Sequence, residues 1–218
     1  MANHLDLEEQ EQLDQLKHFW NQYGNAITWC LIAALSAVAA WNGYQYWQRM
    51  QAAQAAAMYD EIEKISHGAD PAKLDRALGE MKDRFASTSY AQQAALVVAK
   101  AQYESGQVDS AKSALSWVAE KASDKGYVAI ARLRLASIQM DAKAFDQALK
   151  TLDTDMGDSF AALRADRRGD IFLAQGKKLD AKTEYLKAYK GFDERVDYRR
   201  LVEVKLSALG AYPGDFVK

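Results

Sequence analysis

Side chains able to perform catalysis are scarce in this chain of 218 residues. There is one cysteine, Cys30, and the three histidines are His4, His18 and His67. A single thiol cannot form an intramolecular disulfide or a Cys/His zinc site, and no histidine beyond residue 67 is available as a general base. No phosphate-binding GxxxxGKS/T or GxGxxG sequence occurs either. We therefore expect a non-enzymatic protein without catalytic, cofactor-binding or metal-binding residues.

Helix-breaking residues are also rare. The sequence has two prolines, Pro71 and Pro213, and twelve glycines, while residues with good helix propensity dominate. Hydrophobic residues make up 49% of the chain and charged residues 27%, which is ordinary globular composition. We expect an all-α protein in which about 170 residues behind an N-terminal segment form one domain.

An excess of positive charge is absent as well, since the formal net charge is −2. No basic stripe alternates with aromatic residues, so the sequence predicts no nucleic-acid partner. Acidic residues gather in an N-terminal tail, residues 1–22, which holds one lysine, Lys17, and the acids Asp6, Glu8, Glu9, Glu11 and Asp14.

Charged residues are missing altogether between Phe19 and Gln48. Crossing the hydrocarbon core of a membrane takes about 20 helical residues, and residues 23–47 are long and apolar enough to do so. Aromatic residues crowd both ends of this segment, as they do at the interfaces of membrane helices. The residues that we assign to these interfaces are Trp20, Tyr23, Trp41, Tyr44 and Trp47. The sequence thus predicts one transmembrane helix.

Two other interpretations of this segment compete with an anchor. One is a buried core helix, which an uncharged stretch with aromatic ends disfavours. The other is a signal peptide cleaved after Ala37-Val-Ala39, which has the small-x-small form of a cleavage site. An acidic leader disfavours it, because signal peptides begin with a short basic region. Orientation stays undetermined, since Lys17 stands on one side and Arg49 and Lys64 on the other.

Three stretches behind the membrane segment superimpose without gaps, at spacings of thirty-seven and thirty-three positions. Each has a small residue and, twelve positions later, an alanine, with a turn residue five before that alanine and a larger apolar residue four after it. The pattern resembles the tetratricopeptide repeat (TPR), a helix–turn–helix unit whose small residues let two helices cross closely. The residues are Ala99, Ala136 and Gly169; Ala111, Ala148 and Ala181; Gly106, Lys143 and Gly176; and Leu115, Leu152 and Tyr185.

The flanking sequence extends this TPR-like domain to residues 48–218. A long first helix is expected to continue from the membrane segment to about Ser66. Asp70 followed by Pro71 predicts an N-cap and the first position of a helix over 71–85. The clear units lie at about 90–121, 127–155 and 160–190, and a terminal helix at about 194–209 caps the solenoid through Val196, Leu201, Val204, Leu206 and Leu209.

The order of these parts resembles the YfgM family, the ancillary subunit of the bacterial SecYEG translocon. The residues that carry the resemblance are Arg168-Gly-Asp-Ile-Phe-Leu-Ala-Gln-Gly176 with Ala181, Val204-Lys-Leu-Ser-Ala-Leu209 and Trp41-Asn-Gly-Tyr-Gln-Tyr-Trp47. The resemblance covers essentially the whole chain. It implies an inner-membrane protein with a cytoplasmic tail and a periplasmic TPR-like domain.

The resemblance also implies partners. These are SecYEG and a membrane-anchored periplasmic chaperone of the prolyl-isomerase type, in the service of newly translocated chains. In that family the cytoplasmic tail is further linked to control of a stress-response regulator.

In TPR proteins, the first helix of each pair lines a concave groove. The corresponding positions of the three units here give a candidate partner groove. Its apolar residues could hold extended segments of unfolded chains or a partner's helix. Taken singly, Leu96, Tyr103, Leu133, Met140 and Leu173 are expected to pack between helices, and Asp166 and Asp170 beside Arg167 and Arg168 to form a solvated helix surface. The groove residues are Gln93, Leu96, Lys100 and Tyr103; Ile130, Leu133, Ser137 and Met140; and Leu163, Asp166, Asp170 and Leu173.

Three hypotheses for function follow. The first is a non-enzymatic, chaperone-like accessory subunit of protein translocation that binds partners and client chains through this groove. The alternative is a membrane tether whose acidic tail, an amphipathic helix with Leu5, Leu13 and Leu16, sequesters a cytoplasmic response regulator. The third is a secreted TPR protein of envelope or division assembly, which cleavage after Ala39 would support.

Overall fold

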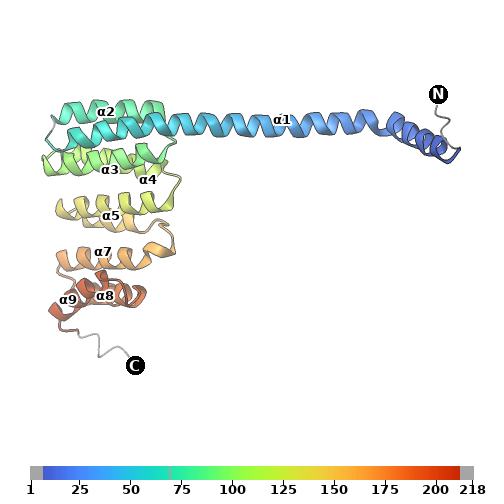
Figure 1. Cartoon of the computed structure of the whole chain (residues 1–218). Helices are drawn as coiled ribbons and strands as arrows, with labels where there is room; N and C mark the ends of the chain where they lie inside the picture. The colour runs from blue at the N-terminus through green and yellow to red at the C-terminus, as the bar shows by residue number, and fades with distance from the viewer. Residues whose placement is uncertain (1–6, 69, 212–218) are drawn as a thin grey trace. The chain divides into compact units, whose positions relative to one another are not determined.

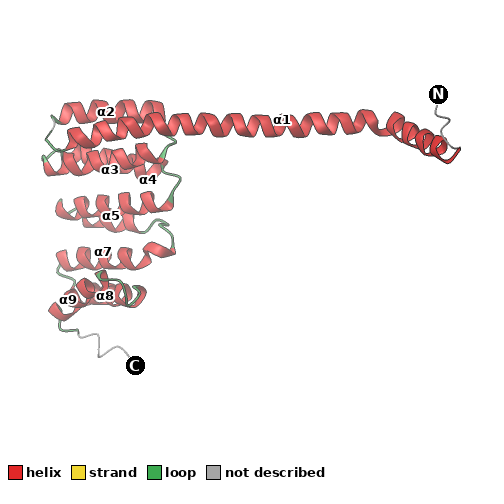
Figure 2. Ribbon diagram, viewed as in Figure 1, coloured by secondary structure: helices red, strands yellow, loops and turns green. Residues whose placement is uncertain are grey.

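The computed structural model describes residues 7–68 and 70–211, and every regular element in that part of the chain is a helix (Figure 2). The all-α prediction is thus confirmed, while Leu5 of the predicted tail helix lies outside the described residues. The elements are α1 (Leu7–Ser66), α2 (Pro71–Phe85), α3 (Ser89–Glu104), α4 (Val108–Lys121), α5 (Lys125–Asp141), α6 (Phe145–Leu152), the 3-10 turn η1 (Asp158–Phe160), α7 (Ala161–Ala174), α8 (Lys178–Gly191) and α9 (Tyr198–Ala208).

The chain divides into two compact units, Met1–Gln51 and Ala52–Lys218, and α1 contributes to both. In the first unit, α1 is long and apolar enough to cross a membrane, and only 6% of its most apolar stretch is buried. The five aromatic residues assigned to membrane interfaces are all exposed on this helix. A core helix would bury such side chains, so the arrangement fits a membrane anchor.

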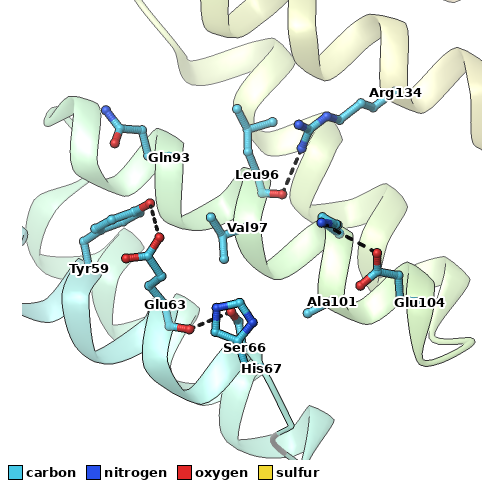
Figure 3. Close-up of a pocket in the computed structure, with 11 residues that line it drawn as sticks. Tyr59, Glu63, Ser66, His67, Gln93, Leu96, Val97, Ala101, Glu104 and Arg134 are labelled. Carbon is cyan, nitrogen blue, oxygen red and sulfur yellow. Dashed lines mark hydrogen bonds and ion pairs between the residues drawn. The ribbon is translucent and has the colours of Figure 1, made fainter.

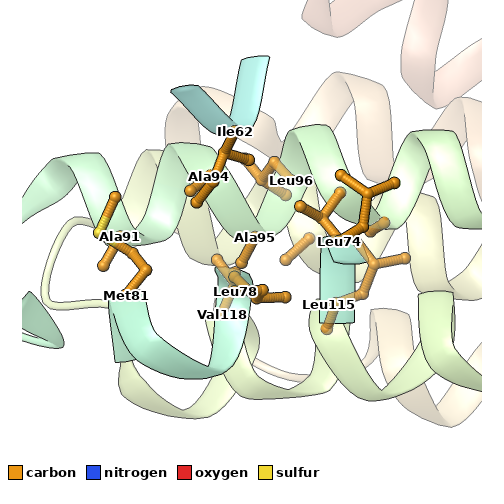
Figure 4. Close-up of a cluster of buried hydrophobic side chains, with 14 of the residues drawn as sticks. Ile62, Leu74, Leu78, Met81, Ala91, Ala94, Ala95, Leu96, Leu115 and Val118 are labelled. Carbon is orange, nitrogen blue, oxygen red and sulfur yellow. The ribbon is translucent and has the colours of Figure 1, made fainter. Parts of the chain in front are cut away.

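The second unit is a stack of helical hairpins. The end of α1 packs with α2 in one apolar core, followed by the pairs α3/α4, α5/α6 and α7/α8 and by α9 at the end of the stack (Figure 1). Figure 4 shows how Ile62 of α1, Leu78 of α2 and Leu115 of α4 join one buried cluster with α3. The predicted TPR-like solenoid is therefore confirmed.

The repeat register extends further than the sequence pattern indicated. Buried residues occupy the equivalent position of five successive first helices, and the two spacings that separate the clear units recur at the added ones. They are Ile62, Ala99, Ala136, Gly169 and Val202. The end of α1 is thus the first helix of an additional unit, and α9 is the first helix of another. Terminal units of a solenoid are commonly atypical, and here they carry large residues where inner units carry small ones.

The turns within the three inner units follow one geometry. Gly106, Lys143 and Gly176 all adopt a left-handed conformation, with φ of 82°, 59° and 78°. In each turn, the amide that follows donates back across the end of the first helix, for example from Gln107 N to Gln102 O at 2.7 Å. This is the Schellman arrangement that glycine favours. Lys143 adopts it as well, at the conformational cost that an L-residue bears there.

Three helix starts, those of α2, α3 and α5, are fixed by capping side chains, the last by Asp124, which accepts from Gly126 N. The Asp70 carboxylate accepts a hydrogen bond from Ala72 N at 3.0 Å, with Pro71 at the first position of α2. The Thr88 hydroxyl accepts one from Ala91 N at the start of α3. The Asp70 cap is the one that the sequence predicts, and Thr88 is a residue type that suits the same role. The predicted helix over 71–85 is confirmed.

The terminal helix buries a different face from the expected one. Val202 and Leu206 are fully buried on one side of it, whereas Leu201 and Val204 are exposed. Val196 is also exposed and precedes the helix, which begins at Tyr198. The expectation that Val196, Leu201 and Val204 pack inward is wrong, because the repeat register, and not the longest apolar stripe, decides which side of α9 meets α8.

Candidate partner groove

Two adjoining cavities lie along the first helices of the second unit. We name them the α1–α3 cavity, of about 360 Å³, and the α3–α5 cavity, of about 280 Å³. The first is lined by Tyr59, Glu63, Ser66, His67, Gln93, Leu96, Val97, Lys100, Ala101, Glu104 and Arg134 (Figure 3). The second is lined by Ala99, Lys100, Tyr103, Leu115, Arg134, Ser137, Ile138 and Asp141. Together they form an open groove on the described part of the chain.

Five of the twelve predicted groove residues line these cavities: Gln93, Leu96, Lys100, Tyr103 and Ser137. The remaining seven are placed elsewhere. Among the latter, Ile130, Leu133 and Met140 are partly buried against the apolar cores, and Leu163 is partly buried on α7. The packing interpretation holds for Leu96, Leu133 and Met140 but not for Tyr103 and Leu173, which are exposed.

The contribution of α1 to the groove was not predicted from the sequence. Tyr59, Glu63 and Ser66 line the α1–α3 cavity. In the register that aligns Ile62 with Ala99, they occupy the positions of Leu96, Lys100 and Tyr103. The same spacing of units is present between Ile62 and Ala99. It was not recognised because the repeat pattern requires a small residue where the helices cross, and Ile62 is large.

Ionisable groups at the α1–α3 cavity form pairs within α1 and within α3. The Tyr59 hydroxyl donates to Glu63 Oε1 at 3.4 Å (Figure 3). Burial raises the pKa of Tyr59 above its ordinary value, and the adjacent Glu63 carboxylate raises it further. The Lys100 ammonium lies 3.8 Å from Glu104 Oε1, with both side chains mostly exposed. Such a pair is weak, so these charges remain available to a ligand.

Polar side chains cross-link α3 to α5 around the groove. Gln93 Nε2 donates to the Tyr127 hydroxyl at 2.6 Å, and Arg134 Nη1 donates to the Leu96 carbonyl at 3.1 Å. The Tyr103 hydroxyl donates to Asp141 Oδ2 at 2.6 Å, and this hydrogen bond raises the pKa of Tyr103. These bonds fix how neighbouring first helices face one another, which shapes both cavities.

Asp166 and Asp170 lie in a buried polar cluster between α7 and α9. Lys205 Nζ donates to both oxygens of Asp166 at 2.8 Å and to Asp170 Oδ1 at 2.7 Å. The Asp166 side chain is only 1% exposed. The expectation that Asp166 and Asp170 form a solvated helix surface is therefore wrong. Burial of carboxylates requires a charged partner, and α9 supplies it from two helices further along the chain.

Two tyrosines complete the cluster. The Tyr198 hydroxyl donates to Asp166 Oδ2 at 2.8 Å, and the Tyr185 hydroxyl donates to Asp170 Oδ1 at 2.7 Å. Burial raises the pKa of Tyr198 to about 12, helped by the Asp166 carboxylate. Burial also strongly raises the pKa of Tyr185. Both phenols thus stay protonated and donate to the carboxylates, and α7 is covered by α9 where the predicted groove would continue.

The groups around the cavities are suited to binding. Their floors are apolar and their rims carry hydroxyls, amides and charges of both signs. Among residues 11–68 and 70–211, no cluster of three or more histidine, cysteine, aspartate or glutamate side chains could hold a metal ion. The groove is thus an open surface that combines apolar area with hydrogen-bonding and charged groups.

Known proteins resemble this chain over most of its length. The sequence matches the tetratricopeptide repeat-like domain over residues 17–211. A protein of Neisseria gonorrhoeae is 30% identical over 96% of this chain and 100% of its own length. One of Haemophilus influenzae is 32% identical over 84% of this chain and 89% of its own length. One of Escherichia coli is 29% identical over 81% and 85%. Each of the three is named ancillary SecYEG translocon subunit.

Proposed function

This chain belongs to the family of ancillary SecYEG translocon subunits, and on that premise we propose that it is a non-enzymatic accessory subunit of the bacterial protein-translocation machinery. Its TPR-like domain binds partner proteins and newly translocated client chains, in the manner of a chaperone. The single observation that carries the binding role is the open groove formed by the α1–α3 and α3–α5 cavities.

The anchor sets the location. Residues 23–47 hold the protein in the inner membrane, and the exposed aromatic residues Trp20, Tyr23, Trp41, Tyr44 and Trp47 sit at the two membrane interfaces. In this proposal the tail is cytoplasmic and the TPR-like domain is periplasmic. Protease added to spheroplasts tests the orientation: it should cleave the TPR-like domain and leave the tail intact, and the reverse pattern would overturn the arrangement.

The proposed partners are the SecYEG complex and a membrane-anchored periplasmic chaperone of the prolyl-isomerase type. Support for the first comes from the names of the relatives. Support for client binding comes from the apolar floors of the cavities, which match side chains that an unfolded chain exposes. In this proposal, extended segments of a client chain bind the groove before the client folds and buries its apolar side chains.

Affinity purification of the full-length protein from mildly solubilised membranes, followed by mass spectrometry, tests this function. We expect SecYEG and a periplasmic chaperone to be recovered with an uncleaved N-terminus. A Ser137→Trp variant fills the α3–α5 cavity and should lose groove-bound partners, whereas Ser113→Trp, at an exposed position on α4, is the matched control. Recovery of neither partner with the wild-type protein would contradict the proposal.

A second candidate function rests on the tail. In the first unit α1 begins at Leu7, and Leu13 and Leu16 are exposed on one side of it. An exposed apolar stripe on a helix can dock a partner. In this alternative the tail sequesters a cytoplasmic stress-response regulator. Deletion of residues 2–17 separates the two functions, because a tether loses its activity and a translocon subunit keeps its partners.

A further inference from the structure

Two cations stand between the two cavities of the groove. Lys100 of α3 and Arg134 of α5 line both the α1–α3 cavity and the α3–α5 cavity. Each acid of the groove lines only one cavity: Glu63 and Glu104 the first, and Asp141 the second. Positive charge is therefore placed at the junction, and negative charge lies to either side of it.

The charges at the junction are largely unsatisfied. Arg134 Nη1 donates to the Leu96 carbonyl (Figure 3), and within residues 11–68 and 70–211 its guanidinium meets no carboxylate. In that same part of the chain, the one ion pair of Lys100 is the long, exposed contact with Glu104. A guanidinium retains several donors after one hydrogen bond, and they are suited to a carboxylate.

The acids beside the junction are in part engaged by neutral donors. Glu63 accepts from Tyr59, and Asp141 accepts from the Tyr103 hydroxyl. A ligand carboxylate at the junction would therefore meet two cations that are free to bind it. A ligand lysine there would meet like charge.

Apolar floors lie on both sides of the junction. Leu96 and Val97 contribute to the α1–α3 cavity, and Ala99, Leu115 and Ile138 form the floor of the α3–α5 cavity. Each cavity is large enough to receive one aliphatic or aromatic side chain. In an extended peptide, alternate side chains point to the same face, so residues i, i+2 and i+4 can reach one cavity, the junction and the other cavity.

We propose that the groove selects extended polypeptide segments in which an acidic residue stands between two apolar residues at alternate positions. The apolar side chains enter the two cavities, and the carboxylate binds Lys100 and Arg134. This inference rests on the proposed binding role of the groove and names the class of segment that it takes.

The test uses the full-length protein in detergent micelles and three fluorescein-labelled peptides. They share the core Leu-Ser-X-Ser-Leu, with Glu, Gln or Lys at X, and fluorescence anisotropy gives each Kd. For the wild-type protein we expect the Glu peptide to bind about tenfold more tightly than the Gln peptide, with the Lys peptide weakest. Raising the salt concentration should reduce the difference.

Two variants locate the selectivity. Arg134→Gln and Lys100→Gln should each bring the ratio of the Gln-peptide Kd to the Glu-peptide Kd close to one. This ratio is the readout because Arg134→Gln also removes the bond to the Leu96 carbonyl, which can change the affinity for both peptides. Lys150→Gln, which removes an exposed cation from α6, is the matched control and should change nothing. Far-UV circular dichroism confirms that each variant keeps its helices.

Equal affinities for the Glu, Gln and Lys peptides would overturn the inference, as would the absence of binding by all three to the folded protein. Acid selectivity that survives in both Gln variants would overturn it too. None of these results affects the translocon association, which purification from membranes measures separately. Selective peptide binding without recovery of SecYEG would instead leave the groove specificity standing and remove the proposed function.

Discussion

The substitution Gly169→Ala tests how closely α7 and α8 approach each other at Gly169. A Cβ at this position would lie 2.5 Å from both Cδ1 and Cε1 of Tyr185, where ordinary carbon contacts are about 3.5–4 Å. The Tyr185 ring is fully buried, and its hydroxyl is bonded to Asp170. It therefore cannot swing away without breaking a buried hydrogen bond. The substitution Gly169→Ala should overpack this crossing.

The expected loss can be estimated from two opposing effects. Overpacking a tight core costs about 1–3 kcal/mol, and the size of this overlap favours the upper end. Replacing a glycine inside a helix by alanine returns about 1 kcal/mol. Gly169→Ala should therefore lower the free energy of unfolding by about 2 kcal/mol. Urea unfolding of the detergent-solubilised full chain, followed by far-UV circular dichroism, measures it.

The residue pairs of the other units suggest a second substitution that should restore part of the lost stability. They pair Ala99 with Leu115 and Ala136 with Leu152 at the equivalent positions. The double variant Gly169→Ala/Tyr185→Leu copies these pairs and should recover part of the loss, though not the hydrogen bond of Tyr185, which is worth about 1 kcal/mol. Wild-type stability of Gly169→Ala alone would refute the close approach. A double variant less stable than the single one would refute the clash as its cause.

Three further predictions concern a turn, an ion cluster and a tyrosine. Lys143→Gly should raise the free energy of unfolding by about 0.5–1 kcal/mol, because glycine adopts the left-handed conformation without strain, at some entropic cost. Gly176→Ala should lower the free energy of unfolding for the same reason. The urea midpoints of the two variants measure both changes. Lys205→Met should cost about 3–5 kcal/mol because it leaves the buried Asp166 carboxylate without its cation, and Lys100→Met, in an exposed pair, close to nothing; equal losses in the two variants would contradict the role of burial. Burial raises the pKa of Tyr198 from its ordinary value of 10.0 to about 12 in the folded protein. The contribution of the protonated phenol to folding stability is therefore complete below pH 10 and is lost as the pH rises toward 12. Over this pH range, the urea midpoint of Tyr198→Phe should fall less than that of the wild-type protein.

The sequence was a good guide to features that depend on neighbours along the chain. Asp70 as an N-cap and Gly106, Lys143 and Gly176 as turn residues were predicted from short spacings, and all behave as expected. Lys143 is the instructive case. The register identified it as the turn residue although its residue type argues against a positive φ, because repetition outweighs the preference of one side chain.

The features that escaped prediction depend on distant partners. Asp166 and Asp170 look like surface acids beside two arginines, and the cation that contacts the buried Asp166 carboxylate, Lys205, belongs to a different helix. The unit that begins in α1 escaped because Ile62 occupies a position where inner units are small. The pattern of α7 alone contains no information about Lys205, whereas the unit in α1 could have been found from the distance between Ile62 and Ala99, which equals that between Ala99 and Ala136.

Polar cross-links are spread unevenly along the solenoid. They join α3 to α5 and α7 to α9, but in the described part of the chain no side-chain hydrogen bond or ion pair joins α5 directly to α7. At that step the polar contacts run through the segment between α6 and η1, where Arg132 of α5 donates to the Asp155 carbonyl and Arg168 of α7 pairs with Asp153, beside apolar packing around Ala136, Leu152 and Ile171. The α5-to-α7 step therefore depends on this connecting segment, so we expect a change in the segment to alter the curvature of the stack first at this step.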